Sequence, residues 1–210
     1  MFPLLRQVVL FKSIGGDVSL VQGAIGLRIN DAGSALSPTT ASANSDAAVD
    51  LGVSNIRFKD LYLSDGVYLG GTGAANKLDD YEEGTWSIGL TFGGASVGMT
   101  ILTNDGAYTK VGNLVTCTGY LALTAKGSST GDAVITGLPF TVSNTNAGYS
   151  ALSIRNIRIS FADILDGNTV KSGTTILLNE TTNAGVISAI NNANFANNSG
   201  FIISVTYRTD

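Results

Sequence analysis

The sequence predicts an all-β protein, and three observations support this fold class. Apolar and polar residues alternate along several segments, most clearly over residues 86–92 and 201–207. Glycine, asparagine and other turn-forming residues interrupt these segments roughly every 8 to 15 positions, as in sandwiches and barrels. No window keeps the 3.6-residue period of an amphipathic helix. The 26 glycines and the many threonines and valines fit strands joined by tight turns.

We expect three parts along the 210-residue chain. Residues 1–30 are predicted to form an N-terminal anchoring segment with short strands. Residues 31–85 are predicted to form an intertwined trimeric β-hairpin stalk. Residues 86–210 are predicted to form a C-terminal β-sandwich, similar to a jelly roll.

The first part contains two short strand patterns. One is the apolar run at residues 8–11, which ends before Gly15-Gly16, and the other is a loose alternation over residues 18–29. Three apolar residues precede both patterns: Phe2, Leu4 and Leu5. They either dock onto another protein or pack on the strands of their own segment.

The second part begins with residues 31–49, which are mostly Ala, Ser and Thr. This stretch is either a flexible linker or a closely wound stalk, whose small side chains let neighbouring chains approach. The next stretch predicts a hairpin, because 61–64 and 67–70 flank Asp65-Gly66, a strong signal for a type I′ turn. A phase shift at Lys59-Asp60 suggests a bulge. A lone hairpin is marginal in water, so copies around a threefold axis are expected to cover it.

Residues 70–85 combine a glycine-rich hinge with an acidic turn, which we expect to mark a domain boundary. The third part then shows strand patterns over eight segments, with a turn at residues 104–106 and a turn of helix near residues 188–195. The segments are 86–92, 97–101, 107–111, 114–124, 134–140, 152–161, 176–178 and 201–207. A phase change is expected near Arg155-Asn156.

Charge and composition exclude several kinds of function. The net charge is −4, and the 12 basic residues are scattered, so no basic stripe predicts nucleic-acid binding. No apolar stretch reaches the ~20 residues of a membrane span, and the N-terminus does not read as a secretory signal. The chain has no histidine, which removes the common catalytic triads and most zinc sites. The single cysteine, Cys117, lies in an alternating pattern and is expected to be buried.

Three kinds of segment are candidates for a functional site. The carboxylates of Asp79, Asp80, Glu82 and Glu83 form a solvated or capping turn, a cation site or, least readily, a catalytic pair. The segment 71–77 resembles a phosphate loop but lacks its Gly-Lys-Ser/Thr ending, so it is interpreted as a hinge. Two glycosylation sequons, at Asn179 and Asn197, are attributed to chance.

Six aromatic residues are either core residues or platforms for sugar rings: Tyr81, Trp86, Tyr108, Tyr120, Tyr149 and Tyr207. Of these, Trp86 is expected in the core and Tyr149 at a loop tip. None of them identifies a ligand site. We therefore assign no catalytic, cofactor or metal residues, and expect no enzymatic activity.

A family resemblance covers residues 50–92. Asp50-Leu51-Gly52, Arg57 to Leu63 and Asp65 to Gly70 resemble a recurrent module of bacteriophage tail-fibre and related virion proteins. Leu78 to Trp86 is similar to the junction that precedes their C-terminal β-domain. The similarity is weaker beyond residue 92 and absent over residues 1–30. It brings no catalytic residues, and the large N-terminal adaptor and long shaft of many such fibres have no counterpart here.

The resemblance implies a homotrimeric virion fibre, held to another virion protein by its N-terminal segment. Its distal domain is expected to bind a host-surface glycan or protein. Such a chain assembles in the host cytoplasm and is exposed on the extracellular particle. A capsid fibre or decoration protein without an essential receptor is the alternative. A polysaccharide depolymerase of the tailspike kind and a cellular lectin or pilus-like adhesin are alternatives of other classes.

Overall fold

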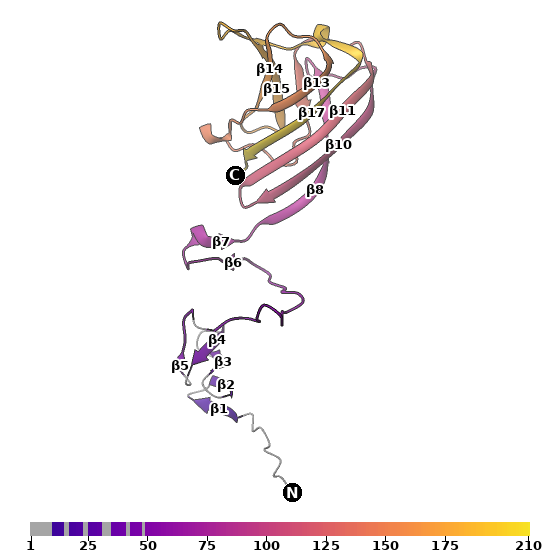
Figure 1. Ribbon diagram of the computed structural model, residues 1–210. Coiled ribbons are helices and arrows are strands. Elements are labelled where there is room, and N and C mark those ends of the chain that lie inside the picture. The colour runs from indigo at the N-terminus through magenta and orange to yellow at the C-terminus, as the bar shows by residue number, and fades with distance from the viewer. Residues whose placement is uncertain (1–9, 15–16, 23–24, 31–34, 41–42, 48) are drawn as a thin grey trace. The chain divides into compact units, whose positions relative to one another are not determined.

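The computed structural model describes residues 10–14, 17–22, 25–30, 35–40, 43–47 and 49–210. These residues form antiparallel strands joined by turns and three short 3-10 helices, with no α-helix among them. The all-β prediction is therefore confirmed. The chain divides into two compact units, residues 1–63 and residues 64–210, and each is described by itself (Figure 1).

The first unit contains one five-stranded antiparallel sheet in the order β1-β2-β3-β4-β5. Its strands are β1 (Leu10–Ile14), β2 (Asp17–Gln22), β3 (Ile25–Asn30), β4 (Ala35–Thr40) and β5 (Ala43–Asn44). The sequence predicted two strands before residue 30 and a linker or wound stalk after it. Instead, part of that linker is β4, which pairs with β3 over six residues. The predicted docking residues Phe2, Leu4 and Leu5 lie outside the described residues.

The predicted hairpin around Asp65-Gly66 is wrong. Residues 61–64 form no strand, and β6 (Val67–Tyr68) pairs with β7 (Lys77–Leu78) across the 3-10 helix η1 (Ala74–Asn76). Gly66 lets the backbone of β7 approach closely and does not form a turn, because an added Cβ would lie 2.7 Å from the Leu78 carbonyl oxygen. The Lys77 ammonium also binds the Asp65 carboxylate at 2.7 Å, which favours the pairing with β7.

The second unit also holds a two-sheet domain, here called the head and formed by β8 to β17. One sheet has the order β13-β17-β11-β10-β8, from β8 (Tyr81–Ser87), β10 (Met99–Val111), β11 (Leu114–Lys126), β13 (Ser153–Ile159) and β17 (Phe195–Arg208). The other has the order β14-β15-β12-β9, with β16 beside β15. Its strands are β9 (Gly89–Phe92), β12 (Ala133–Thr136), β14 (Ile164–Thr169), β15 (Thr175–Thr181) and β16 (Ile187–Ala189).

Both sheets contribute to one buried core, which agrees with a two-layer head (Figure 1). The alternation predicted along residues 114–124 is confirmed, because Val115, Cys117 and Leu121 are fully buried while Thr116 and Thr118 are exposed. The segment 86–92 was predicted as one strand. It divides at the buried Ile88 into β8 in the first sheet and β9 in the second, so one short segment joins the two layers.

The turn predicted at residues 104–106 is wrong, since β10 runs through it without interruption. Gly106 lies opposite Trp86 on β8, and an added Cβ would come within 2.4 Å of the Trp86 Nε1 atom. The glycine is therefore needed to make room for the indole ring, not to reverse the chain. The indole N–H donates a hydrogen bond to the Thr118 carbonyl oxygen at 3.1 Å.

Two further predictions are partly right. The long strand predicted over residues 152–161 is β13, but its irregularity lies at Arg158, which has a φ of 53°, rather than near Arg155. The turn of helix predicted near residues 188–195 is the short 3-10 helix η3 (Asn192–Asn194), capped by the Asn191 side chain. The strand β14 was not predicted, because its segment Asp166-Gly167-Asn168 is polar although the strand is partly buried.

Candidate functional site

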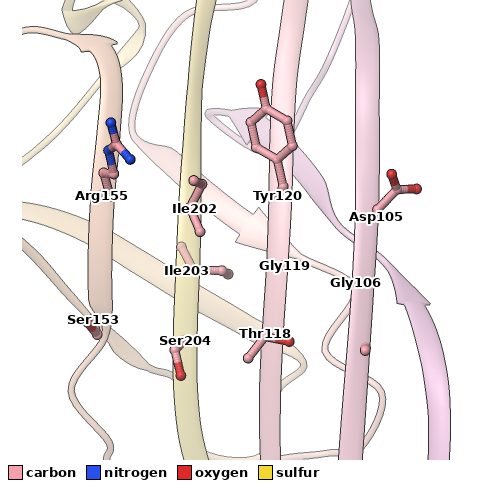
Figure 2. Close-up of a pocket in the computed structure, with 11 residues that line it drawn as sticks. Asp105, Gly106, Thr118, Gly119, Tyr120, Ser153, Arg155, Ile202, Ile203 and Ser204 are labelled. Atoms are coloured by element: carbon pink, nitrogen blue, oxygen red, sulfur yellow. The ribbon is translucent and has the colours of Figure 1, made fainter.

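A hollow lined by several strands lies on the head, on the side of its five-stranded sheet that faces away from the core. This side is called the outer face. The hollow has a volume of about 670 Å³ and draws its lining from β10, β11, β13 and β17 (Figure 2). Its floor includes Gly106 and Gly119, which lie opposite each other on β10 and β11. An added Cβ on either glycine would point toward the buried Trp86 or Ile88, so these two residues line the hollow with backbone atoms alone.

One row of side chains crosses the hollow from strand to strand. Asp105 is opposite Tyr120, Tyr120 is opposite Ile202, and Ile202 is opposite Arg155. Figure 2 shows these four residues on four neighbouring strands, with Tyr120 and Ile202 between the two charges. We call them the charged row. Directly opposite residues project from the same face of a sheet, so the register alone places these side chains together.

The two charges in this row do not neutralise each other. Asp105 and Arg155 are separated by three strand spacings, or about 14 Å. Both are exposed, and neither has an ion-pair or hydrogen-bond partner for its side chain within the described part of the chain. The row therefore presents an acidic group and a basic group on either side of an apolar centre.

The rest of the outer face is mostly hydroxyl groups. The next row contains Ala107, Thr118, Ser204 and Ser153, and the row after it contains Thr116 and Thr206, whose hydroxyls lie 3.0 Å apart. The last row is apolar and exposed, with Val111 opposite both Tyr81 and Leu114. The outer face is thus a smooth, hydroxyl-rich surface between two partly apolar rows.

The four predicted carboxylates do not gather at one point. Asp80 pairs with the buried Lys110 ammonium, Glu82 accepts a hydrogen bond from the Tyr108 hydroxyl, and Glu83 accepts one from Tyr81. The hydrogen bond to Glu82 raises the pKa of Tyr108. No group of three or more potential acidic or cysteine metal ligands occurs among the residues the structure describes. Asp80 and Glu82 fasten the start of β8 to β10, whereas the bond of Glu83 lies within β8.

The glycine-rich segment 71–77 ends in a lysine that is already engaged. Lys77 binds Asp65 at 2.7 Å and Asp79 at 3.3 Å, and its pKa is raised chiefly by the hydrogen bond to Asp65. This lysine joins the two ends of the β6–β7 hairpin.

The predicted aromatic residues have different surroundings. Trp86 is buried, as predicted, and so is Tyr207, whose hydroxyl bonds both the amide and the carbonyl oxygen of Phe140. Tyr108 is half-buried against the Phe140 ring at a centroid distance of 5.4 Å. Three remain exposed: Tyr81 and Tyr120 on the outer face, and Tyr149 with the Lys171 ammonium 5.0 Å from its ring centroid.

Cys117 is fully buried, and burial raises the pKa of its thiol to about 12. A thiol with this pKa stays neutral and unreactive at ordinary pH. We predict that a thiol reagent at pH 8 labels the folded protein at least about 100-fold more slowly than the protein in guanidinium. Equal rates in the two states would contradict the buried position.

The same shift has a consequence for stability at alkaline pH. The unfolded thiol loses its proton near its ordinary pKa of 9.0, whereas the folded thiol keeps it up to about pH 12. Between these values the unfolded state binds fewer protons, so the stabilising contribution is lost as the pH rises. Cys117→Ala is the matched variant in which this part of the alkaline loss disappears.

Within the described residues, none of the helical segments is long and apolar enough to cross a membrane. The sequon residues Asn179 and Asn197 lie on β15 and β17, and the Asn197 side chain accepts a hydrogen bond from the Lys126 amide.

The outer face offers hydroxyl groups, the exposed rings of Tyr81 and Tyr120, and both acidic and basic side chains, all of which can bind a partner. The sequence could identify Tyr120 as a candidate, but not the charged row, because its four members come from segments up to 97 residues apart. Comparisons with protein-family models, curated proteins and solved structures found no match for this chain.

Proposed function

We propose that this chain is a structural protein of a bacteriophage virion, a homotrimeric tail fibre whose head binds the host surface. The observation that carries the proposal is the large apolar surface left uncovered between residues 51 and 69. Tyr62 is 89% exposed and Ile56 is 70% exposed. The other large apolar or aromatic residues there are also exposed, namely Leu51, Val53, Phe58, Leu61, Leu63, Val67, Tyr68 and Leu69.

A single chain rarely leaves so many large apolar residues in water. Burying each of them is worth roughly 1.5–3 kcal/mol, so an assembly that covers them gains a large free energy. Identical copies are the nearest source of matching surface, and a closed threefold arrangement covers each copy equally. We therefore place the intertwined trimeric stalk, predicted for residues 31–85, around this run.

The N-terminal sheet supplies the attachment in this proposal. Ile25, Leu27 and Ile29 share one face of β3, and Leu36 on β4 lies opposite Ile29 on that same face. All four are exposed. This apolar face suits a contact with another virion protein. The resemblance of residues 50–92 to tail-fibre modules supports the same role.

Native mass spectrometry and immunolabelling test this function. The purified chain is expected at three times its 21.6 kDa mass over micromolar to nanomolar concentrations. Antibodies against the head should label the tail of the particle, and added protein should compete with particle adsorption to the host. Labelling of the capsid without competition would favour the decoration role instead. A monomer that labels neither structure would overturn the proposal.

A further inference from the structure

We propose that the outer face of the head is the surface through which three copies meet, with Arg155 of each copy paired to Asp105 of the next. This inference rests on the proposed trimer, but it concerns a different part of the chain.

The outer face combines side chains that favour a contact between protein copies with others that need a partner across it. Its charged side chains are Glu83, Asp105, Arg155 and Arg208, and no lysine projects from it at the positions that the structure describes. Tyrosine and arginine are enriched in protein interfaces, whereas lysine, glutamate, aspartate and serine are depleted, so the acids of this face require partners in such a contact. The exposed apolar surface of Tyr120, Ile202 and Val111 loses contact with water there.

In the sequence, the first strand of the outer face follows the uncovered run of residues 51–69 after the β6–β7 hairpin. The exposed Leu78 comes after that run, and the exposed Tyr81 begins β8 and the apolar row of the face. Uncovered apolar side chains therefore continue along the polypeptide from the stalk into the head. A trimer that is closed in the stalk brings three heads together at high local concentration, which favours further contact between them.

The order of strands explains how the two unpaired charges find partners. Tyr120 is on β11, the central strand of the sheet, while Arg155 is on the edge strand β13 and Asp105 is near the opposite edge on β10. When three outer faces surround one axis, β11 lies nearest the axis and the β13 edge of one copy meets the opposite edge of the next. Arg155 then reaches Asp105 of its neighbour over Ser87, the small residue that β8 adds to this row.

This contact is head-to-tail and closes after three copies, so each charge is paired once. A twofold contact would also join Asp105 to Arg155, but it would close at two copies and disagree with a threefold stalk. A glycan bound in the hollow would instead leave the face open in the trimer. The two alternatives differ in what a cross-link would capture.

Cysteine cross-linking tests the contact. The variant Ser87→Cys/Arg155→Cys, oxidised as the full-length chain, is expected to give a covalent trimer in denaturing gels that reducing agent releases, because Ser87 lies on the edge strand that meets Arg155 of the neighbouring copy. The two positions lie four strand spacings, or about 19 Å, apart in one chain, well beyond the reach of an intrachain disulfide. The native Cys117 is fully buried and is the only other cysteine.

Three controls define the result. Each single variant, and Glu83→Cys/Arg155→Cys with its β8 position shifted by about 13 Å, should give little covalent trimer. The Trp86 fluorescence spectrum should remain unchanged, showing that the head is folded. Where the cysteine variant does not fold, charge reversal replaces it. Asp105→Arg or Arg155→Asp alone should raise the dissociation concentration about tenfold, and the double reversal should restore it.

The outcomes separate the two proposals. Native trimers without covalent trimers overturn the outer-face contact and leave the fibre proposal standing. Covalent dimers alone show a twofold contact, and a trimer whose binding to a host glycan is lost in Tyr120→Ala shows an open face. Both results overturn this inference. A chain that is monomeric in native mass spectrometry overturns both proposals together.

Discussion

Gly106→Val should unfold the head or destabilise it by about 3 kcal/mol or more. The first added carbon would lie 2.4 Å from the Trp86 Nε1 atom and 2.8 Å from its Cε2 atom, well inside van der Waals contact. The indole is held from the other side by its hydrogen bond to Thr118, so it cannot move away freely. Valine is a good strand former, so the loss would come from the steric conflict alone.

Fluorescence offers a direct measurement of this effect, because Trp86 is the only tryptophan in the chain. The guanidinium midpoint should fall at fixed protein concentration. Gly173→Ala is a suitable control, since its added carbon lies 3.4 Å or more from its neighbours. In the background Trp86→Leu, where circular dichroism replaces tryptophan fluorescence as the measurement, the same glycine substitution should cost less, because the ring that causes the conflict is gone. An unchanged midpoint in Gly106→Val would disprove this account of β10.

The triple variant Ile56→Ser/Phe58→Ser/Tyr62→Ser should weaken the trimer by at least about a thousandfold. Each of these side chains is uncovered in one chain, and covering it in an assembly is worth roughly 1.5–3 kcal/mol. The loss of three such contacts therefore exceeds about 4 kcal/mol, which corresponds to a thousandfold change. Mass photometry over a dilution series measures the shift from trimer to monomer.

The interleaved polar residues provide a matched control for the stalk variant. Asn55→Ser/Arg57→Ser/Lys59→Ser changes the same stretch without removing apolar surface, and should leave the trimer intact. The midpoint followed by Trp86 fluorescence shows in both variants whether the head is folded. A triple apolar variant that dissociates no more readily than the control would argue against self-association through residues 51–69.

The strands of the head could be predicted from the sequence where buried and exposed residues alternate. Burial alternates over residues 114–121 of β11 and 201–207 of β17, and both stretches have the predicted buried face. The turn predicted at residues 104–106 failed because Asn-Asp-Gly is a turn signal only when nothing else explains the glycine. Here the explanation is an indole ring on another strand, which no local pattern contains.

The prediction of a hairpin around Asp65-Gly66 failed for a related reason. Asp65-Gly66 carries strong local turn chemistry, but Asp65 binds Lys77 and Gly66 gives room for β7 to approach. Both effects depend on a segment more than ten residues away. The charged row of the outer face was also hidden, because Asp105 and Arg155 become related only through the register of β11 and β17. Their association is a property of the sheet and not of any segment.

The entry of the chain into the head has a mechanical consequence for a fibre. In the proposed fibre, tension arriving along the stalk would enter the head at the first residue of β8. Seven paired residues join that strand to β10, and Asp80 and Glu82 add side-chain links to Lys110 and Tyr108. The chain then passes through Ile88 into the second sheet, so both layers share the force before either one can peel away.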